Sequence, residues 1–360
     1  MDFQNRNQRL RDKLSEVGLD GILVTRPENV FYLIGINNLE GVYFLHKDGA
    51  LLFTDFRYFG LVKDEEVFFD MIQCKNFQKD MDDWFKKNDF NKIGFESGHL
   101  SFETHKNWKK TFTSIILIPC VDFVEGLRLI KDKYEQAHIK MSAKILGEVM
   151  DKIPEMIKKD PDMTERDLSI ELDYQMKTSG AQRSAFDIIV ASDERSAFPH
   201  AFPTDHIIEK ANLLLVDCGA VYEGYHTDIT RVIMLQSSHN QRIKEIYSVV
   251  REAQVAAMSI VSPGTPAKEI DMAARDVIKK AGFAEYFGHG TGHGVGLMIH
   301  EEPKINMRSE TILREGMVFT IEPGIYLQNE FGIRWEDMVL VTDDGYDLLT
   351  SINWENLNGF

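Results

Sequence analysis

The chain has 360 residues, of which 43% are hydrophobic and 27% are charged, a length and composition that favour a globular protein of two domains. Its formal net charge of −16 disfavours a nucleic-acid partner, which requires a basic face. No apolar run is long enough to cross a bilayer, the first residues contain no apolar signal core, and three scattered cysteines without CxxC spacing are typical of a reducing cytoplasm.

The first third of the chain alternates predicted helices and strands. The expected elements are a helix over 7–17, a strand over 20–25, a helix over 28–35, a hairpin of 42–46 and 50–56 around Lys47-Asp48-Gly49, strands over 67–72, 92–97 and 113–119, and a helix over 78–87. This pattern predicts a mixed α/β domain over residues 1–125. The domain contains neither a Gly-rich phosphate loop nor a cluster of acid–base residues.

The second domain, over residues 126–360, repeats an order of helices followed by strands. Helical segments are expected over 135–159 and after the capping-box pattern of Thr164 and Asp167, followed by strands over 186–192, 212–218 and 229–235, helices over 238–260 and 267–280, and then strands and Gly-rich turns. This order predicts two structurally similar halves, although no clear sequence repeat accompanies them.

Five residues of metal-ligand type lie in this second domain. Each adjoins an apolar strand-like segment or a Gly-rich turn: Asp217, Asp228, His293, Glu322 and Glu336. Four carboxylates are too many acids to bury together unless cations neutralise them. The set therefore indicates an oxygen-rich site for two divalent ions, the arrangement of a dinuclear metallohydrolase.

Each residue also has a structural explanation when it is taken alone. An aspartate at a strand end is commonly a turn or cap residue, and Glu322 or Glu336 could form a buried salt bridge with Arg334 or Arg231. His293 could lie in a flexible surface loop, since five glycines surround it between Gly288 and Gly296. The joint occurrence of all five beside apolar strands favours the metal site.

The motifs around these residues resemble the proline-specific metallopeptidases of the pita-bread superfamily. The segment from His289 to Glu301 satisfies the glycine–histidine signature of Xaa-Pro dipeptidases (prolidases) and Xaa-Pro aminopeptidases. The segments VDCGAVYEGYHTDITR, IEPG and RWEDMVLVT match in order and spacing. The resemblance implies an α/β (α+β) fold, with a creatinase-like N-terminal α/β domain followed by a pseudo-two-fold pita-bread catalytic domain.

The resemblance also implies a role for each matching position. Asp217 binds one metal through both carboxylate oxygens, Asp228 and Glu336 bridge the two metals, and His293 and Glu322 complete the ligand set of the second metal. Mn²⁺ is the favoured ion, with Co²⁺, Zn²⁺ and Fe²⁺ as alternatives. Glu322 also accepts the proton of the attacking water, His200 and His300 hydrogen-bond the substrate and the developing oxyanion, and His289 and Arg334 line the substrate site.

Several alternatives remain open at this stage. The chain could be a dipeptidase or an aminopeptidase for an N-terminal Xaa-Pro bond, a broader or methionine-type aminopeptidase, or a catalytically silent pita-bread binding module. The complete ligand set disfavours the silent module. The expected partners are a proline-containing peptide and, as the resemblance implies, a second copy of the chain in a homodimer, with no nucleic acid and no membrane.

Overall fold

The computed structural model describes residues 2–37, 39–62, 67–235 and 241–350, and it divides the chain into two compact units. The first unit covers residues 1–128 and the second covers residues 129–360. The boundary expected from the sequence was residue 125. Among the described residues, no helix combines the length and the apolar character needed to cross a bilayer.

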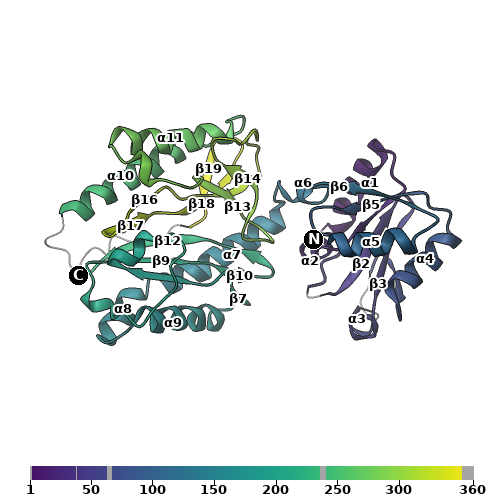
Figure 1. Cartoon of the computed structure of the whole chain (residues 1–360), viewed down its shortest axis with the longest axis horizontal. Coiled ribbons are helices and arrows are strands. Elements are labelled where there is room, and N and C mark those ends of the chain that lie inside the picture. The colour runs from purple at the N-terminus through teal and green to yellow at the C-terminus, as the bar shows by residue number, and fades with distance from the viewer. Residues whose placement is uncertain (1, 38, 63–66, 236–240, 351–360) are drawn as a thin grey trace. The chain divides into compact units, whose positions relative to one another are not determined.

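The first unit is built on one six-stranded mixed sheet with the strand order β4-β3-β2-β1-β5-β6 (Figure 1). Its elements are α1 (Phe3–Glu16), β1 (Gly21–Val24), α2 (Pro27–Ile34), β2 (Gly41–His46), β3 (Gly49–Thr54), α3 (Phe56–Val62), β4 (Asp70–Gln73), α4 (Phe77–Lys87), β5 (Lys92–Glu96), α5 (Phe102–Thr111), β6 (Ile116–Cys120) and α6 (Glu125–Arg128). The predicted hairpin is confirmed, because β2 and β3 pair antiparallel with His46 opposite Gly49.

The second unit contains all the candidate site residues. Its elements are α7 (Lys133–Met150), α8 (Ile153–Lys159), α9 (Glu165–Thr178), β7 (Arg183–Ser184), β8 (Ile189–Ser192), η1 (Asp193–Ala197), η2 (Ile208–Lys210), β9 (Leu213–Cys218), β10 (Ala220–Tyr222), β11 (Tyr225–His226), β12 (Ile229–Met234), α10 (Gln241–Met258), α11 (Ala267–Lys280), η3 (Ala284–Tyr286), β13 (Gly292–Gly294), β14 (Glu301–Ile305), β15 (Val318–Ile321), β16 (Gly324–Leu327), β17 (Phe331–Arg334), β18 (Asp337–Val341) and β19 (Tyr346–Leu348). Residues 236–240, where the helix expected over 238–260 begins, lie outside the described part of the chain.

The expected repetition of helices and strands is present in this unit. In the first half β9 pairs antiparallel with both β8 and β12, and in the second half β15 pairs antiparallel with both β13 and β18. Figure 1 shows α8 and α9 on one side of these strands and α10 and α11 on the opposite side. Strands covered by helices lose their polar faces, which explains the continuous apolar run Leu213–Val216.

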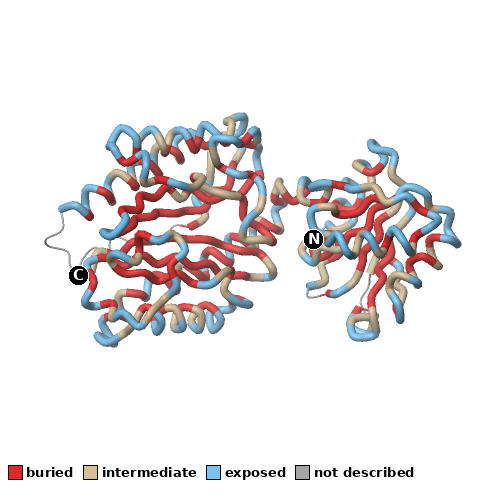
Figure 2. The backbone as a smooth tube through the Cα atoms, viewed as in Figure 1, coloured by how far each residue is buried: buried red, intermediate tan, exposed pale blue. Residues whose placement is uncertain are grey.

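The core of the second unit lies between its strands and their covering helices. Every residue of β9 is buried, and the buried backbone in Figure 2 follows the same strands. Apolar residues on α10 and α11, including Ile246, Val250, Ile270 and Ala274, belong to the same buried cluster as Leu214 and Phe319. This packing holds the strand ends, where the site residues lie, on a rigid frame.

Two helical regions show how the structure differs from the sequence expectation. The helical run expected over 135–159 is divided into α7 and α8, because Pro154 lies in the first turn of α8 and cannot continue a helix from the preceding turn. Helix α5 was not predicted, since Trp108 is its only buried residue and its apolar periodicity is weak. Ser101 begins α5 by accepting a hydrogen bond from the Thr104 N–H at 3.0 Å.

Candidate metal and active site

The first half of the second unit places two aspartates at adjacent strand ends. Asp217 is the penultimate residue of β9, and Asp228 immediately precedes β12. The antiparallel register sets Thr230 opposite Asp217, so the two carboxylates lie at the same end of the strand pair.

The second half places two glutamates in the same way. Glu322 immediately follows β15, Glu336 immediately precedes β18, and Ile321 pairs with Asp337. Backbone hydrogen bonds join these positions to their surroundings, with the Glu336 N–H donating to the Thr230 carbonyl at 3.2 Å. The two acidic pairs thus occupy corresponding positions in the two halves and face one cavity.

His293 reaches this cavity from β13, where glycines allow close approach of the backbone. A Cβ atom on Gly292 would lie 1.9 Å from the Thr320 carbonyl oxygen, so only glycine fits there. The His293 Nδ1 atom lies 3.1 Å from the Gly294 carbonyl oxygen. A proton on Nδ1 that donates to this carbonyl leaves the lone pair of Nε2 available to a cation.

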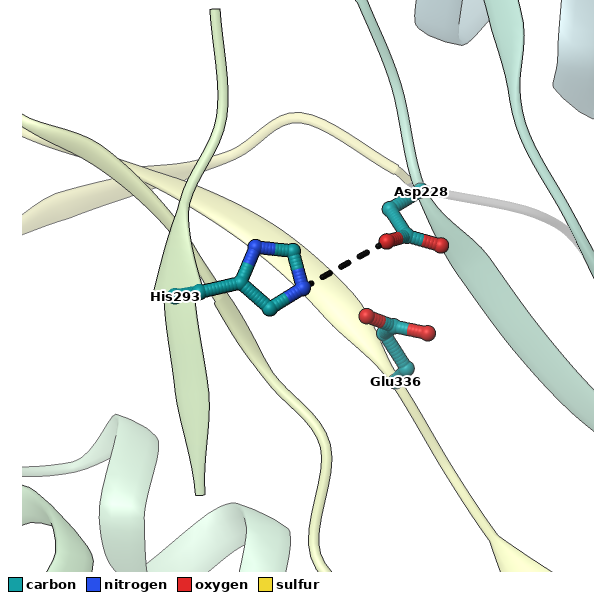
Figure 3. Close-up of side chains that lie close together, drawn as sticks. All are labelled: Asp228, His293 and Glu336. Atoms are coloured by element: carbon teal, nitrogen blue, oxygen red, sulfur yellow. Dashed lines mark ion pairs between the residues drawn. The ribbon is translucent and has the colours of Figure 1, made fainter. Parts of the chain in front are cut away.

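Three potential ligands form a tight group (Figure 3). Asp228, His293 and Glu336 each offer one ligand atom, and these atoms lie within 4.8 Å of one another. The His293 Nε2 atom lies 3.6 Å from Asp228 Oδ2 and 3.5 Å from Glu322 Oε1. Glu322 therefore adjoins the group, while Asp217 lies outside this tight group and lines the same cavity.

Arg334 binds Asp217 rather than either glutamate. Its Nη2 atom donates to Asp217 Oδ2 at 2.5 Å, and its Nε and Nη1 atoms donate to Thr230 Oγ1 and the Tyr326 hydroxyl, each at 2.9 Å. Arg231 pairs with Asp337 at 2.5 Å. The salt bridges considered as a structural explanation for Glu322 and Glu336 are therefore absent from the described residues.

The donor set fits divalent cations. Asp217 Oδ1 and Asp228 Oδ1 are buried and have no hydrogen-bond partner among the described residues. Burial, reinforced by neighbouring carboxylates, raises the pKa values of Asp228 and Glu336 well above the ordinary range, and burial also raises the pKa of Glu322. Bound cations would neutralise these carboxylates and supply the missing partners of the two oxygens.

The other histidines predicted from the sequence line the same cavity, which has a volume of about 990 Å³. The ring centroids of His300 and His293 lie 4.3 Å apart, and the His289 Nε2 atom lies 2.9 Å from the Tyr326 hydroxyl oxygen. His200 lies on the exposed loop that follows η1. Burial lowers the pKa values of His289, His293 and His300, which favours neutral imidazoles at pH 7.

All nine residues singled out from the sequence therefore line one cavity: His200, Asp217, Asp228, His289, His293, His300, Glu322, Arg334 and Glu336. Sequence reasoning missed Tyr326, which contacts both His289 and Arg334, and Thr230, whose hydroxyl donates to Glu336 Oε2 at 2.6 Å. Neither residue carries a distinctive sequence signal, since tyrosine and threonine are common in buried strands.

Two protein-family models match the chain in succession. The Creatinase/Prolidase N-terminal domain matches residues 6–130, and metallopeptidase family M24 matches residues 137–343. Together the two matches correspond to the two units of the structure.

Individual relatives match along nearly the whole length. A Xaa-Pro dipeptidase of Pyrococcus furiosus is 38% identical over 357 residues, which covers 99% of this chain and 100% of the relative. The structure of a Xaa-Pro dipeptidase from Bacillus anthracis superposes with a TM-score of 0.92 at 36% identity, covering 97% of this chain and 98% of that one. An X-Pro aminopeptidase from Thermotoga maritima superposes with a TM-score of 0.86 at 33% identity, covering 95% of this chain and 98% of that one. The expected fold, a creatinase-type domain followed by a pita-bread domain, is confirmed.

Proposed function

The chain belongs to metallopeptidase family M24 and is a peptidase, and from this premise we propose that it hydrolyses the bond between an N-terminal residue and proline. Its substrates are Xaa-Pro dipeptides or short peptides that begin with Xaa-Pro. The observation that carries the proposal is the joint lining of one cavity by four carboxylates, His293 and three further histidines.

We propose that Asp217, Asp228, His293, Glu322 and Glu336 hold two divalent ions, with Mn²⁺ as the favoured ion and Co²⁺, Zn²⁺ or Fe²⁺ as alternatives. Two such ions, when bound there, would supply Lewis-acid chemistry that activates a water molecule and polarises the scissile carbonyl. The unpartnered oxygens of Asp217 and Asp228 and the raised pKa values of the acids support this assignment. Arg334 orients Asp217 through its 2.5 Å ion pair.

The remaining residues of the cavity handle the substrate and its protons. Glu322 accepts the proton of the attacking water, since its side chain is 16% exposed and faces the cavity beside His293. His200 and His300 donate hydrogen bonds to the substrate carbonyl and to the oxyanion that develops from it. Tyr326 and Arg334 hold His289 and Asp217 in place.

The chemistry of the Xaa-Pro bond differs from that of other peptide bonds in two ways that bear on its hydrolysis. The nitrogen of a Xaa-Pro bond carries no hydrogen, so a protease that recognises the extended backbone through that N–H cannot use this bond. The leaving proline nitrogen must gain a proton, which the carboxyl group of Glu322 or a histidine of the cavity can supply. A free substrate amine near the acidic group would restrict cleavage to the first residue.

We further propose that the enzyme is a cytoplasmic homodimer. Three buried free cysteines fit a reducing compartment. Sedimentation velocity at micromolar concentration tests the assembly, and a monomeric species would contradict the dimer.

The test of the function is hydrolysis of Ala-Pro and Ala-Pro-Ala, each with added Mn²⁺ and with EDTA. Cleavage of the dipeptide alone, abolished by EDTA, would identify a dipeptidase. Cleavage of the tripeptide after alanine would identify an Xaa-Pro aminopeptidase. If neither peptide is cleaved while Ala-Ala or Met-Ala is, the proline specificity is wrong although the metal site stands. Activity that resists the chelator would refute the metal mechanism.

A further inference from the structure

Two fully buried carboxylates outside the proposed ligand set bind the segments that form opposite parts of the cavity lining. Glu165 begins α9 and Asp271 lies in the second turn of α11, and each is 0% exposed. Each forms an ion pair with an arginine and accepts two hydrogen bonds from one threonine. We name these groups the Glu165 clamp (Glu165, Arg195, Thr204) and the Asp271 clamp (Asp271, Arg275, Thr291).

The Glu165 clamp holds both ends of the segment 192–204, called the His200 loop from here on, which contains η1 and the residues after it. Glu165 Oε1 accepts from the Ser192 N–H at 2.7 Å, where the loop begins. Glu165 Oε2 accepts from the N–H and the hydroxyl of Thr204, at 3.0 and 2.7 Å, where the loop ends. Arg195 pairs with the same oxygen at 3.1 Å and also donates to the Phe202 carbonyl.

The Asp271 clamp makes the corresponding contacts in the other half. Asp271 Oδ1 accepts from the N–H and the hydroxyl of Thr291, at 3.0 and 2.8 Å. Arg275 pairs with Asp271 at 2.7 Å and donates to the carbonyl groups of Phe287 and His289. Thr291 stands between His289 and His293, and its carbonyl accepts from the Glu322 N–H at 2.8 Å.

The His200 loop contributes five residues to the cavity lining: Ala197, Pro199, His200, Ala201 and Phe202. Within the part of the chain that the structure describes, no hydrogen bond orients the exposed His200 side chain. Its position therefore depends on the backbone of the loop, and Glu165 accepts hydrogen bonds at both ends of that backbone. No proposed metal ligand lies between Ser192 and Thr204.

We propose that Glu165 is a positioning residue that holds His200 against the substrate, and that Asp271 has the equivalent role for the segment of His289 and His293. This inference rests on the proposed function of the cavity. The two clamps can be tested separately. The Glu165 clamp acts on a substrate-binding histidine alone, whereas the Asp271 clamp acts on a segment that contains a proposed metal ligand.

Glu165→Gln removes the charge and places an amide group against donors that need an acceptor. We expect kcat for the Xaa-Pro peptide to fall at least tenfold with bound Mn²⁺ unchanged by elemental analysis. Asp271→Asn should instead weaken Mn²⁺ binding, measured by titration calorimetry.

Glu96→Gln is the matched control. Glu96 is 4% exposed, lies in the first unit and accepts hydrogen bonds from Thr25, Arg26 and Asn29. It should leave kcat within twofold of the wild-type value.

A double-mutant cycle with His200→Ala separates positioning from general destabilisation. If Glu165 acts through His200, the double variant should have the kcat of His200→Ala alone. Multiplicative losses, or a kcat for Glu165→Gln within twofold of the wild-type value, would overturn the proposal. Thr204→Val, which removes only the hydroxyl donor, replaces Glu165→Gln in the cycle if the latter does not fold.

Hydrogen exchange followed by mass spectrometry tests the clamp without reference to activity. Glu165→Gln should accelerate exchange in residues 192–206 while exchange in residues 287–293 stays unchanged, and Asp271→Asn should do the reverse. Unchanged exchange in 192–206 would refute the Glu165 clamp. A wild-type enzyme that cleaves no Xaa-Pro peptide would refute the proposed function instead.

Discussion

His293 and His300 are adjacent in space, but substituting each of them by alanine is expected to have a different effect. Their ring centroids lie 4.3 Å apart, but the Nε2 atom of His293 faces Asp228 and Glu322 at 3.6 and 3.5 Å. His293→Ala should therefore lose Mn²⁺ and activity together. His300→Ala should keep the metal and lose a factor of about 10²–10³ in kcat, the usual effect of removing one oxyanion donor.

Metal content per chain, measured beside kcat on the same preparations, distinguishes these outcomes. Loss of Mn²⁺ from His300→Ala would assign that histidine to the metal site. Retention of Mn²⁺ at wild-type affinity by His293→Ala would remove it from the ligand set.

The three cysteines are expected to be unreactive in the folded protein. All three are buried, and burial raises the pKa of Cys74 to about 11, raises that of Cys120 and raises that of Cys218 well above its usual range. An ordinary thiol with a pKa of about 8.5 is roughly one-quarter ionised at pH 8, whereas a pKa of about 11 leaves roughly one thiolate in a thousand. Iodoacetamide at pH 8 should therefore modify none of the three in an hour, and all three in guanidinium chloride. Rapid alkylation of the native protein, detected by intact mass, would contradict this burial.

At the scale of residues, the sequence identified the chemistry of the cavity but not its hydrogen bonds. Asp217, Asp228, Glu322 and Glu336 could be found because acids beside apolar strands are rare without a reason. Tyr326, Glu165 and Asp271 could not be found, because the partners that tie them to the cavity lining, Arg334, Thr204 and Thr291, lie 8, 39 and 20 residues away. The choice of Asp217 as the partner of Arg334 likewise depends on packing between the two halves.

Among the elements, the contact between η1 and β17 joins the His200 loop to the strand of Arg334. The Gly332 N–H donates to Ser196 Oγ at 2.8 Å, and a Cβ atom on Gly332 would lie 2.1 Å from the Ser196 carbonyl oxygen. Gly332→Ala should therefore force the two elements apart, at a cost of about 1–3 kcal/mol in the free energy of unfolding.

Gly345→Ala is the control for this substitution, because a Cβ atom there meets no neighbouring atom within 4 Å. Its effect should stay within about 0.5 kcal/mol of zero. Denaturant unfolding of both variants measures the difference. If the Gly332→Ala variant is as stable as the Gly345→Ala variant, η1 and β17 can move apart without a cost in the free energy of unfolding, which would contradict this prediction.

The helices whose buried residues recur at regular helical spacing could be predicted from the sequence. The helix expected over 267–280 coincides with α11, whose buried residues recur at helical spacing: Ala267, Ile270, Asp271, Ala274 and Ile278. The start of α1 was placed four residues late, because the Asp2 side chain caps the helix through the Asn5 N–H at 2.9 Å. Element ends are decided by such single contacts, which the apolar pattern does not record.

At the scale of the whole molecule, metal binding should stabilise the second unit alone. All the proposed ligands lie in residues 129–360, and an ion at one hundred times its dissociation constant adds about 2.7 kcal/mol to the stability of the unit that binds it. For a unit of this size that corresponds to an increase of roughly 5–10 °C in its unfolding temperature. Scanning calorimetry of EDTA-treated protein, before and after addition of Mn²⁺, measures the shift.

The His293→Ala variant serves as the control and should show no shift. Hydrogen exchange with and without Mn²⁺ assigns the effect to one unit, since protection should increase only in residues 129–350. Equal stabilisation of the first unit, or no stabilisation of the second, would contradict a site confined to the strand ends of the pita-bread domain.

The separation of the ligands along the chain has a consequence for how the ion is acquired. Asp228 and Glu336 belong to different halves, so the group of Asp228, His293 and Glu336 assembles only after both halves have folded against each other. A nascent chain on the ribosome cannot hold the cation before its last third has emerged. Since affinity for first-row divalent ions differs from one ion to the next, the ion captured would depend on its availability when folding finishes as well as on its affinity. The first ion captured would therefore depend on the cell's free metal pool at that moment.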